Sequence, residues 1–511
     1  MDGASRSAAT IDWTELSSAQ MPIWLDLQSG TDPRFYIIGG YLRIAGAINP
    51  AVFHCAVALA MARNDALRLR IHGDDSKQSF HPGRAPPVTF LDLSESSDPE
   101  AAFLDTIDKE FTRNFDLERG PLFHFVLARA EERRWFLLIR YHHLIIDGFG
   151  ISLMIRAVAD AYKTIMAGEP EGEISSLSYE RFIGDDAAYW ASPRRARDVA
   201  YWVDCFRRLP EPLFPMRRGD GAPDIYMPSQ SVQFWLDWTK YSRFLDVCRS
   251  RGTTPFPVLT ALLAAVLART LQRRDITIGV PILNRPTAEF KRTIGMFAGM
   301  MPLRLDVDEA ASASDLVAHV GEQLRRGYRH QRAPIHDVQH ALGLARLGRR
   351  QLFDVALSYE KNDYDFHIGE AAFQLIGLTG GYELNPLALY VREYHREKPV
   401  LFDFAFNSRH LSPPEVERLA ERFRVLFEAY LDADTAPLGK LSLLPASERA
   451  LVVEGWNASG SEVREATLAE LFAEAVLRHG AGEAVRCGGQ SVSYRALEAR
   501  ASRLARRLIA L

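Results

Sequence analysis

The stretch Tyr141-His142-His143-Leu144-Ile145-Ile146-Asp147-Gly148 places two histidines at the end of an apolar run and an aspartate-glycine pair shortly after them. Side chains alternate along a strand, so His142 and His143 are expected to face opposite ways, and only one of them can serve a given site directly. Asp147 is spaced to fold back and fix the loop. Gly148 permits backbone angles, or a close approach of a ligand, that a Cβ atom would forbid. These four residues are candidate site residues.

The segments around this stretch alternate between strand-like and helix-period patterns. Two β-rich runs, 121–127 and 135–141, precede it, and a helix-period run over 151–167 follows it. Farther upstream, Asn49-Pro50 is a helix start signal. The pattern there predicts helices at 17–28 and 50–63 and strands at 36–44 and 67–71. An α/β lobe over residues 1–180 is therefore predicted.

A second cycle of the same kind follows the polar stretch 172–178. It predicts helices at 186–208, 241–250, 257–271 and 314–330 and strands at 276–281, 301–307, 353–359, 387–394 and 400–406. We therefore expect a second α/β lobe over residues 181–446. A linker is predicted at 447–465. Residues 466–511 show a helix, a hairpin and a helix that stop in mid-pattern, so the chain is expected to end inside a third domain.

The composition argues against several classes of protein. The 511 residues carry 61 basic and 65 acidic side chains, so neither the dense cationic face of a nucleic-acid binder nor a polybasic membrane anchor is expected. The four cysteines lie far apart without a CxxC pair, so neither a disulfide framework nor a metal site is indicated. No apolar run approaches the roughly 18 residues that membrane insertion needs. We expect a cytoplasmic protein that acts as a monomer.

The histidine motif, together with several others, resembles the condensation domains of nonribosomal peptide synthetases. Order and spacing agree over residues 15 to 445. The matching segments are Ser17-Ser18-Ala19-Gln20, Arg63-Asn64-Asp65-Ala66-Leu67-Arg68, Gly279-Val280-Pro281-Ile282-Leu283-Asn284-Arg285, Ile294-Gly295-Met296-Phe297 and His330-Gln331-Arg332-Ala333-Pro334. In the tail, 454–460 is similar to the linker after such domains, and residues 466–511 resemble the truncated start of an adenylation domain.

The resemblance implies an α/β (α+β) fold, a pseudodimer of two chloramphenicol-acetyltransferase-like lobes in a V shape. The active site would lie in a tunnel between the lobes, with the histidine motif halfway along it. An acyl thioester enters from one side, and an aminoacyl thioester on a peptidyl carrier protein enters from the other. The amine attacks the acyl carbonyl, an amide forms and the donor thiol leaves. No cofactor is bound covalently, because the substrates are carried as phosphopantetheine or coenzyme A thioesters.

The chemistry of this reaction assigns roles to the candidate residues. An α-amine has a reference pKa of about 7.7 to 8.0, so an appreciable fraction is already neutral at pH 7. His143, with a reference pKa near 6.5, can accept the proton released after attack or hold the amine by a hydrogen bond. The resemblance gives Asp147 a structural role, with Arg285 as its expected partner. His142 is expected to support the loop, and the Gly148 backbone to approach the developing oxyanion.

The sequence departs from the family's pattern at three places. Pro22 stands for the usual arginine of the opening motif, Gly150 for a serine, and Ala298-Gly299-Met300-Met301 for a V-N-T continuation. Methionine suits irregular apolar surfaces, which favours a channel for an alkyl donor chain, with ordinary core methionines as the alternative. The candidate channel residues are Met296, Met300, Met301 and Phe149.

The opening motif begins at Leu16, which leaves no room upstream for a carrier domain, so the donor is expected to arrive in trans. We expect a starter condensation domain that N-acylates the first amino acid of a lipopeptide with a fatty acyl group from acyl-CoA or an acyl carrier protein. An elongation or siderophore-type domain, which accepts an aryl or peptidyl donor from a separate carrier protein, is the alternative. A docking platform for carrier proteins without catalysis is disfavoured by the intact histidine motif.

Overall fold

The structure is a computed structural model that describes residues 13–82, 86–169, 178–217, 229–361, 366–378, 381, 383–433, 435–460 and 465–511. Of the polar stretch that marks the predicted lobe boundary, residues 172–177 lie outside the described residues. The chain forms two units, one that ends at Leu443 and one that begins at Leu444. The candidate site residues all belong to the larger unit.

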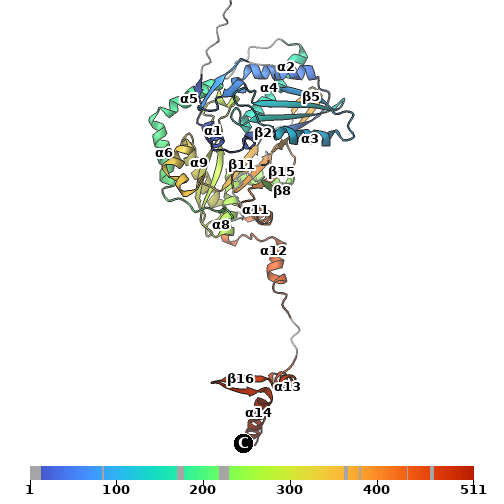
Figure 1. Ribbon diagram of the computed structural model, residues 1–511, viewed down its shortest axis with the longest axis vertical. Helices are drawn as coiled ribbons and strands as arrows, with labels where there is room; N and C mark the ends of the chain where they lie inside the picture. The colour runs from blue at the N-terminus through green and yellow to red at the C-terminus, as the bar shows by residue number, and fades with distance from the viewer. Residues whose placement is uncertain are drawn as a thin grey trace, which may run out of the picture. The chain divides into compact units, whose positions relative to one another are not determined.

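The histidine motif follows β7 (Arg134–His142), which lies inside a six-stranded sheet with the order β12-β13-β2-β7-β6-β5 (Figure 1). Both faces of this strand are covered. Leu137 and Ile139 share a core with α2 (Pro50–Arg63) and α4 (Gly148–Ala167), whereas Phe136 and Leu138 pack with α3 (Pro99–Phe111). Burial on both faces explains why the strand is an uninterrupted apolar run and not an alternating one.

The second half of the larger unit is built on another six-stranded sheet, with the order β10-β9-β11-β14-β15-β8. One of its faces packs on the apolar core formed with α8 (Pro255–Leu271), α9 (Ala313–Arg329) and α11 (Pro413–Ala433). The strands are β8 (Gln230–Leu236), β9 (Asp275–Ile282), β10 (Gly299–Asp306), β11 (Val355–Lys361), β14 (Leu387–Glu393) and β15 (Val400–Phe406).

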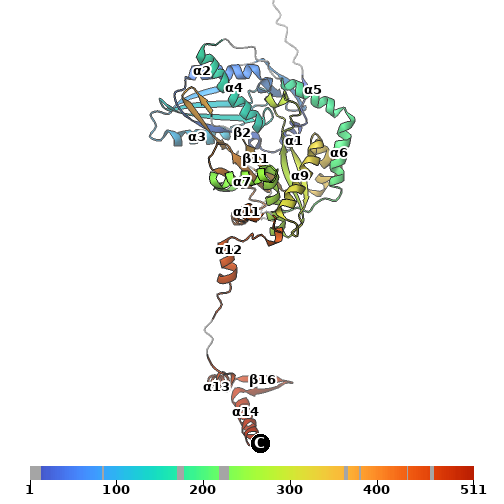
Figure 2. The ribbon, with the colours of Figure 1, turned by 180° about the vertical axis from the view of Figure 1, so that it is seen from behind.

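One strand of the second half lies in the sheet of the first half. β13 (Ala371–Leu378) pairs antiparallel with β2 (Ile37–Ala45), from Ala372 opposite Ala45 to Leu378 opposite Gly39. β12 (Phe366–Ile368) extends this edge, and Figure 2 shows the orange hairpin of β12 and β13 within the blue and teal sheet. Residues 366–378 therefore belong structurally to the first lobe, which the sequence boundary near residue 180 does not anticipate.

The remaining elements of the larger unit connect these two sheets and cover them. They are β1 (Thr14–Glu15), α1 (Met21–Gln28), β3 (Leu69–Ile71), β4 (Lys77–Phe80), β5 (Val88–Asp92), β6 (Phe123–Glu131), α5 (Tyr179–Trp190), α6 (Pro193–Cys205), α7 (Trp238–Ser250) and α10 (Ile335–Ala341). β1, β4 and β3 form a small sheet of their own.

The smaller unit contains helices and one hairpin. Its elements are α12 (Ala446–Ala450), α13 (Leu468–His479), β16 (Glu483–Cys487), β17 (Gln490–Ser493) and α14 (Tyr494–Ile509). The predicted linker at 447–465 is helical in its first part, because α12 and a π-helical turn cover 446–455. Residues 461–464 of that linker lie outside the described residues.

The described helices were also compared with the length and apolar content of a membrane span. No single described helix is both long enough and apolar enough to span a membrane. Among the described helices, only α7 and α8 reach that length and apolar content when taken together, and they form a pair bent by 103°.

Candidate active site

Asp147 is the N-cap of α4 and is buried, with 1% of its surface exposed. Its Oδ1 accepts a hydrogen bond from the backbone N–H of Gly150 at 2.7 Å, which satisfies a free donor of the first helical turn. Its Oδ2 accepts from the backbone N–H groups of Phe297 and Ala298, each at 3.1 Å. These bonds fix the turn after β7 to a segment of the second half.

Arg285 forms the predicted ion pair with Asp147. Its Nη2 lies 2.7 Å from Oδ1 and 2.9 Å from Oδ2, and both side chains are almost fully buried. The second guanidinium nitrogen donates to the carbonyl oxygens of Phe290 at 2.9 Å and Thr293 at 2.6 Å. Because both carboxylate oxygens of Asp147 already have several donors, this group is placed to hold the loop and not to accept a substrate proton.

His142 ends β7 and is buried next to two aromatic rings. Its ring lies 6.5 Å from that of Tyr36 and 6.4 Å from that of Phe115, measured between centroids. Burial and the neighbouring His143 lower the pKa of His142 to about 3, so the imidazole is neutral at pH 7. Its Nδ1 accepts a hydrogen bond from the Leu144 backbone N–H at 3.2 Å, which supports the turn that carries His143.

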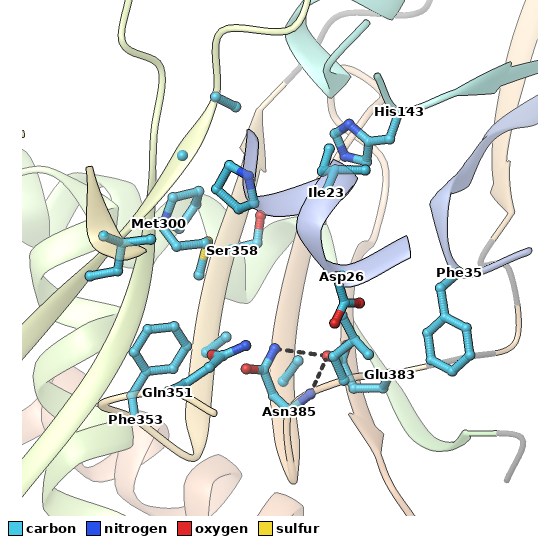
Figure 3. Close-up of a pocket in the computed structure, with 18 of the residues that line it drawn as sticks. Ile23, Asp26, Phe35, His143, Met300, Gln351, Phe353, Ser358, Glu383 and Asn385 are labelled. Carbon is cyan, nitrogen blue, oxygen red and sulfur yellow. Dashed lines mark hydrogen bonds between the residues drawn. The ribbon is translucent and has the colours of Figure 1, made fainter. Parts of the chain in front are cut away.

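His143 faces the other way, as strand alternation predicts, and lines a large cavity (Figure 3). Its backbone N–H donates to the carbonyl oxygen of Tyr36 at 2.7 Å, which prolongs the pairing of β2 and β7 by one residue. Burial lowers the pKa of the His143 imidazole, and the nearby carboxylate of Asp147 opposes this shift only in part. The imidazole is therefore neutral at pH 7 and available to accept a hydrogen bond or a proton.

The two glycines after Asp147, Gly148 and Gly150, differ in the space that surrounds each of them. Gly148 begins α4 and lines the cavity, and a Cβ atom there would meet no protein atom within 4 Å. Its φ is not positive, so of the two alternatives offered for this glycine the unusual backbone angles are excluded. The close approach of a ligand stays a prediction, and the absent side chain leaves open space in the cavity. A Cβ atom at Gly150 would lie 2.7 Å from Ile146 Cγ1, so this departure from the family pattern follows from close packing.

The cavity has a volume of about 2500 Å³ and is lined by both halves of the larger unit. This exceeds the roughly 300 to 1,000 Å³ typical of small-ligand pockets, and it is large enough for two extended substrates. In the view of Figure 3, Ile23 of α1 lies beside His143 and Asp26 of the same helix lies beside Glu383. Ser358, Glu383 and Asn385 are lining residues from the second half.

Three of the four candidate channel residues line the cavity and one does not. Met296, Met300 and Phe149 are lining residues, and Met300 is 36% exposed. Met301 is not, because neighbouring residues of β10 point to opposite faces of the sheet. Its side chain is 2% exposed and packs in the core of the second half, near Gly327 and Trp202. For Met301 the alternative of an ordinary core methionine is correct.

The polar wall of the second half contains cavity residues that sequence reasoning missed. In β14, Ala388, Tyr390 and Arg392 line the cavity, while the alternate residues belong to the core. In β15, Asp403 and Ala405 face the cavity in the same way. The signal is the two-residue period of polar and apolar side chains in both strands, which marks one face of a sheet as polar.

Comparison with known proteins relates these features to a family. A model of the family described as "Condensation domain" matches residues 11–453. The chain is 24% identical to the dimodular nonribosomal peptide synthase of Bacillus subtilis (strain 168) over 496 residues, which cover 97% of this chain and 21% of that protein. It is 27% identical to the isonitrile lipopeptide synthase of Streptomyces coeruleorubidus over 512 residues, which cover 100% of this chain and 34% of that protein. The chain thus spans about a fifth to a third of these curated relatives.

Solved structures share the fold. A mutant of the starter condensation domain of rhizomide synthetase, in complex with C8-CoA, is 28% identical and has a TM-score of 0.75, with 84% of this chain and 98% of that chain covered. The first condensation domain of the CDA synthetase is 24% identical and has a TM-score of 0.74, with 85% and 99% covered. The predicted fold class, with two chloramphenicol-acetyltransferase-like α/β lobes, is confirmed.

Proposed function

Because the chain belongs to the condensation-domain family of nonribosomal peptide synthetases, whose members catalyse amide bond formation, we propose that it N-acylates the first amino acid of a lipopeptide with a fatty acyl group. The observation that carries the proposal is that His143 and the N-terminus of α4 at Gly148 line one cavity large enough for two substrates. Similarity to the starter condensation domain of rhizomide synthetase, a mutant of which was solved with C8-CoA, supports the starter type.

In the proposed reaction, the neutral amine nitrogen of the acceptor attacks the carbonyl carbon of the acyl thioester. His143 holds this amine by a hydrogen bond and takes its excess proton as the carbon–nitrogen bond forms. The carbon–sulfur bond then breaks, and the leaving thiolate takes up the proton held by His143, which gives the free thiol and returns the imidazole to its neutral form. A neutral His143 suits this role because a protonated imidazole could not accept the proton.

The negative charge that develops on the carbonyl oxygen needs stabilisation. The first N–H groups of a helix have no acceptor within the helix, and its N-terminus carries a partial positive charge. Asp147 occupies the N–H of Gly150 but leaves the helix start at Gly148 open to the cavity. We place the developing oxyanion beside Gly148.

The donor is proposed to be an acyl-CoA or an acyl carrier protein thioester, and the acceptor an aminoacyl group on a peptidyl carrier protein. Both substrates are held on pantetheine arms, so the reaction needs no covalently bound cofactor. Met296, Met300 and Phe149 are apolar lining residues suited to an alkyl chain.

The experiment presents the purified chain with a series of acyl-CoA donors and an aminoacyl-loaded carrier protein, and identifies amides by mass spectrometry. Transfer from medium or long acyl-CoA is the expected result. Transfer only from a peptidyl or aryl carrier would instead assign an elongation or siderophore-type domain. Binding of carrier proteins without any acyl transfer would indicate that the chain is a docking platform without catalysis.

For the smaller unit, we propose that residues 466–511 are the beginning of an adenylation domain. Its helices expose large apolar side chains, among them Leu468 at 86%, Leu477 at 84% and Ile509 at 85%. No residue of α13 or α14 is buried. Helices with such apolar surface normally pack on further structure.

A further inference from the structure

Among the described residues, the wall of the cavity that the second sheet provides carries three carboxylates and two cations, Arg392 and Lys361, and Lys361 pairs with Glu393. Glu360 of β11, Asp403 of β15 and Glu383, just before β14, all line it. Arg392 of β14 is the one cation that contacts these carboxylates among the described residues, with Nη1 2.6 Å from Asp403 Oδ2 and Nε 3.3 Å from Glu360 Oε2. Two of the three carboxylates, Glu360 and Asp403, thus share the guanidinium of Arg392, and Glu383 is not in contact with it.

Glu383 has only neutral partners within the described structure. Its Oε1 accepts hydrogen bonds from the backbone N–H of Asn385 at 3.0 Å and from its Nδ2 at 2.8 Å, which Figure 3 shows as dashed lines. Its Oε2 accepts from the hydroxyl of Tyr390 at 2.8 Å. These bonds hold the carboxylate in one position, although the residue is only 7% exposed. Burial raises the pKa of Glu383, which is the expected shift for a carboxylate without a cation beside it.

Three further oxygen atoms on this wall are buried and, within the described residues, have no hydrogen-bond donor. They are Asp403 Oδ1, Asn385 Oδ1 and Gln351 Oε1. Asp403 is 1% exposed, so its free oxygen is not simply hydrated at the protein surface. Buried acceptors without donors are uncommon and call for a partner. All three accept hydrogen bonds, so the partner must be a donor.

We propose that this wall, formed by Glu383, Asp403, Asn385 and Gln351, binds the cationic side chain of a basic amino acid presented as the acceptor. The inference rests on the proposed function and deepens it by naming the class of acceptor. An ammonium or guanidinium group supplies several N–H donors for the free oxygen atoms, together with the positive charge that Glu383 lacks.

The carboxylate wall suits the acceptor substrate better than the acyl donor. A fatty acyl chain has no hydrogen-bond donor and gains nothing from a wall of oxygen atoms. The α-amine of the acceptor must reach His143, and Figure 3 shows Ile23 and Asp26 between His143 and Glu383 in that view. Asp26 adds another carboxylate to this region, with Arg350 at 3.6 Å. The side chain of the acceptor, and not its α-amine, is therefore the group that lies against the carboxylate wall.

The test measures octanoyl transfer from octanoyl-CoA to ornithinyl-pantetheine and to norleucyl-pantetheine, whose side chains have the same length. We expect kcat/KM to be at least about tenfold higher for the ornithinyl acceptor. This factor is at the lower end of the effects measured when one partner of a close charge pair is removed. Glu383→Gln keeps the shape of the side chain and should abolish this preference while transfer to norleucyl-pantetheine is kept. Glu322→Gln, on the exposed face of α9, is the matched control.

Equal rates for the two acceptors, or equal losses for both in Glu383→Gln, would overturn the inference. Binding of the ornithinyl and norleucyl amides of pantetheine, measured by calorimetry in the absence of acyl-CoA, separates this failure from failure of the proposed function. Selective binding of the ornithinyl amide without any transfer would support the cation site and contradict the acylation reaction. Equal binding of both amides would contradict the cation site whether or not transfer occurs.

Discussion

His142 and His143 are neighbours in the chain, but their side chains have different surroundings. His142 is packed against Tyr36 and Phe115 and receives a backbone hydrogen bond, whereas His143 opens on the cavity. We expect His143→Ala to reduce turnover by roughly 10² to 10⁴ with an unchanged melting temperature, because it removes the group that handles the amine proton. Steady-state kinetics with octanoyl-CoA check this, and turnover within a few-fold of the wild type would exclude His143 as the key residue.

The pH dependence of kcat/KM follows from the lowered pKa of His143. Its imidazole becomes protonated only below its ordinary value of about 6.5, so loss of the proton acceptor is confined to that range. Between pH 6.5 and 8 the rate should instead follow deprotonation of the acceptor amine, with a reference pKa of about 7.7 to 8.0. Acceptors whose amines have lower pKa values should shift this part of the pH profile to lower pH. A profile that does not shift would contradict the assignment of this part to the acceptor amine.

We expect Asp147 to contribute to stability and not to proton transfer. Asp147→Asn removes the charge from a buried pair with Arg285 and leaves the guanidinium uncompensated. Breaking a buried ion pair in this way typically costs about 3 to 5 kcal/mol. Denaturant unfolding should show a loss of this size, with Glu322→Gln as a surface control. An unchanged unfolding free energy would show that the pair is not needed to hold the loop.

At the scale of single elements, the first turn of α4 offers a matched pair of glycines. Gly148→Ala places a methyl group in open cavity space and should leave the unfolding free energy unchanged or raised by up to about 1 kcal/mol. It should lower kcat/KM, because the methyl group stands where the substrate carbonyl is expected. Gly150→Ala meets Ile146 and should destabilise the protein by about 1 to 3 kcal/mol. Thermal unfolding and kinetics of both variants distinguish the two effects.

Regular elements with strong local signals were predictable from the sequence. The helix at 50–63 and the strand at 400–406 agree with α2 and β15, because a capping Asn-Pro and an apolar run are local features. The helix predicted at 186–208 is instead two helices, since Pro193 lacks an N–H and begins α6. The helix predicted from Ser17 begins at Met21, because Ser17 and Gln20 bond to each other in the preceding turn.

The candidate site was predictable only where one motif carries it. His143, Asp147 and Arg285 were found from a local pattern and a resemblance, and the predicted Asp147–Arg285 pair is present. Met301 was misplaced because a run of methionines does not show which face of β10 each one occupies. Glu383 and Asp403 were missed because they are related only through Tyr390, which bonds to Glu383 and lies opposite Asp403 in the pairing of β14 with β15. No single segment of the sequence encodes this arrangement.

At the scale of the whole larger unit, the links between its halves include the pair of Asp147 with Arg285 and the pairing of β13 with β2. We therefore expect the halves to unfold together. Hydrogen exchange in increasing urea, read by mass spectrometry, should show β7 and β14 losing protection at the same concentration, the behaviour of one cooperative unit. Loss of protection in β14 at clearly lower urea would show that the halves are independent.

The pairing of β2 with β13 also determines when the first sheet can be completed during translation. While the chain is being made, β2 can pair with β7 as soon as His142 has emerged, but its other edge has no partner until residues 371–378 appear. At translation rates of about 5 to 20 residues per second, that edge stays open for on the order of 10 to 50 s. An unpaired edge is a template for association with other nascent chains. Efficient production of this protein should therefore depend on the pace of the ribosome and on chaperones that shield the edge of β2.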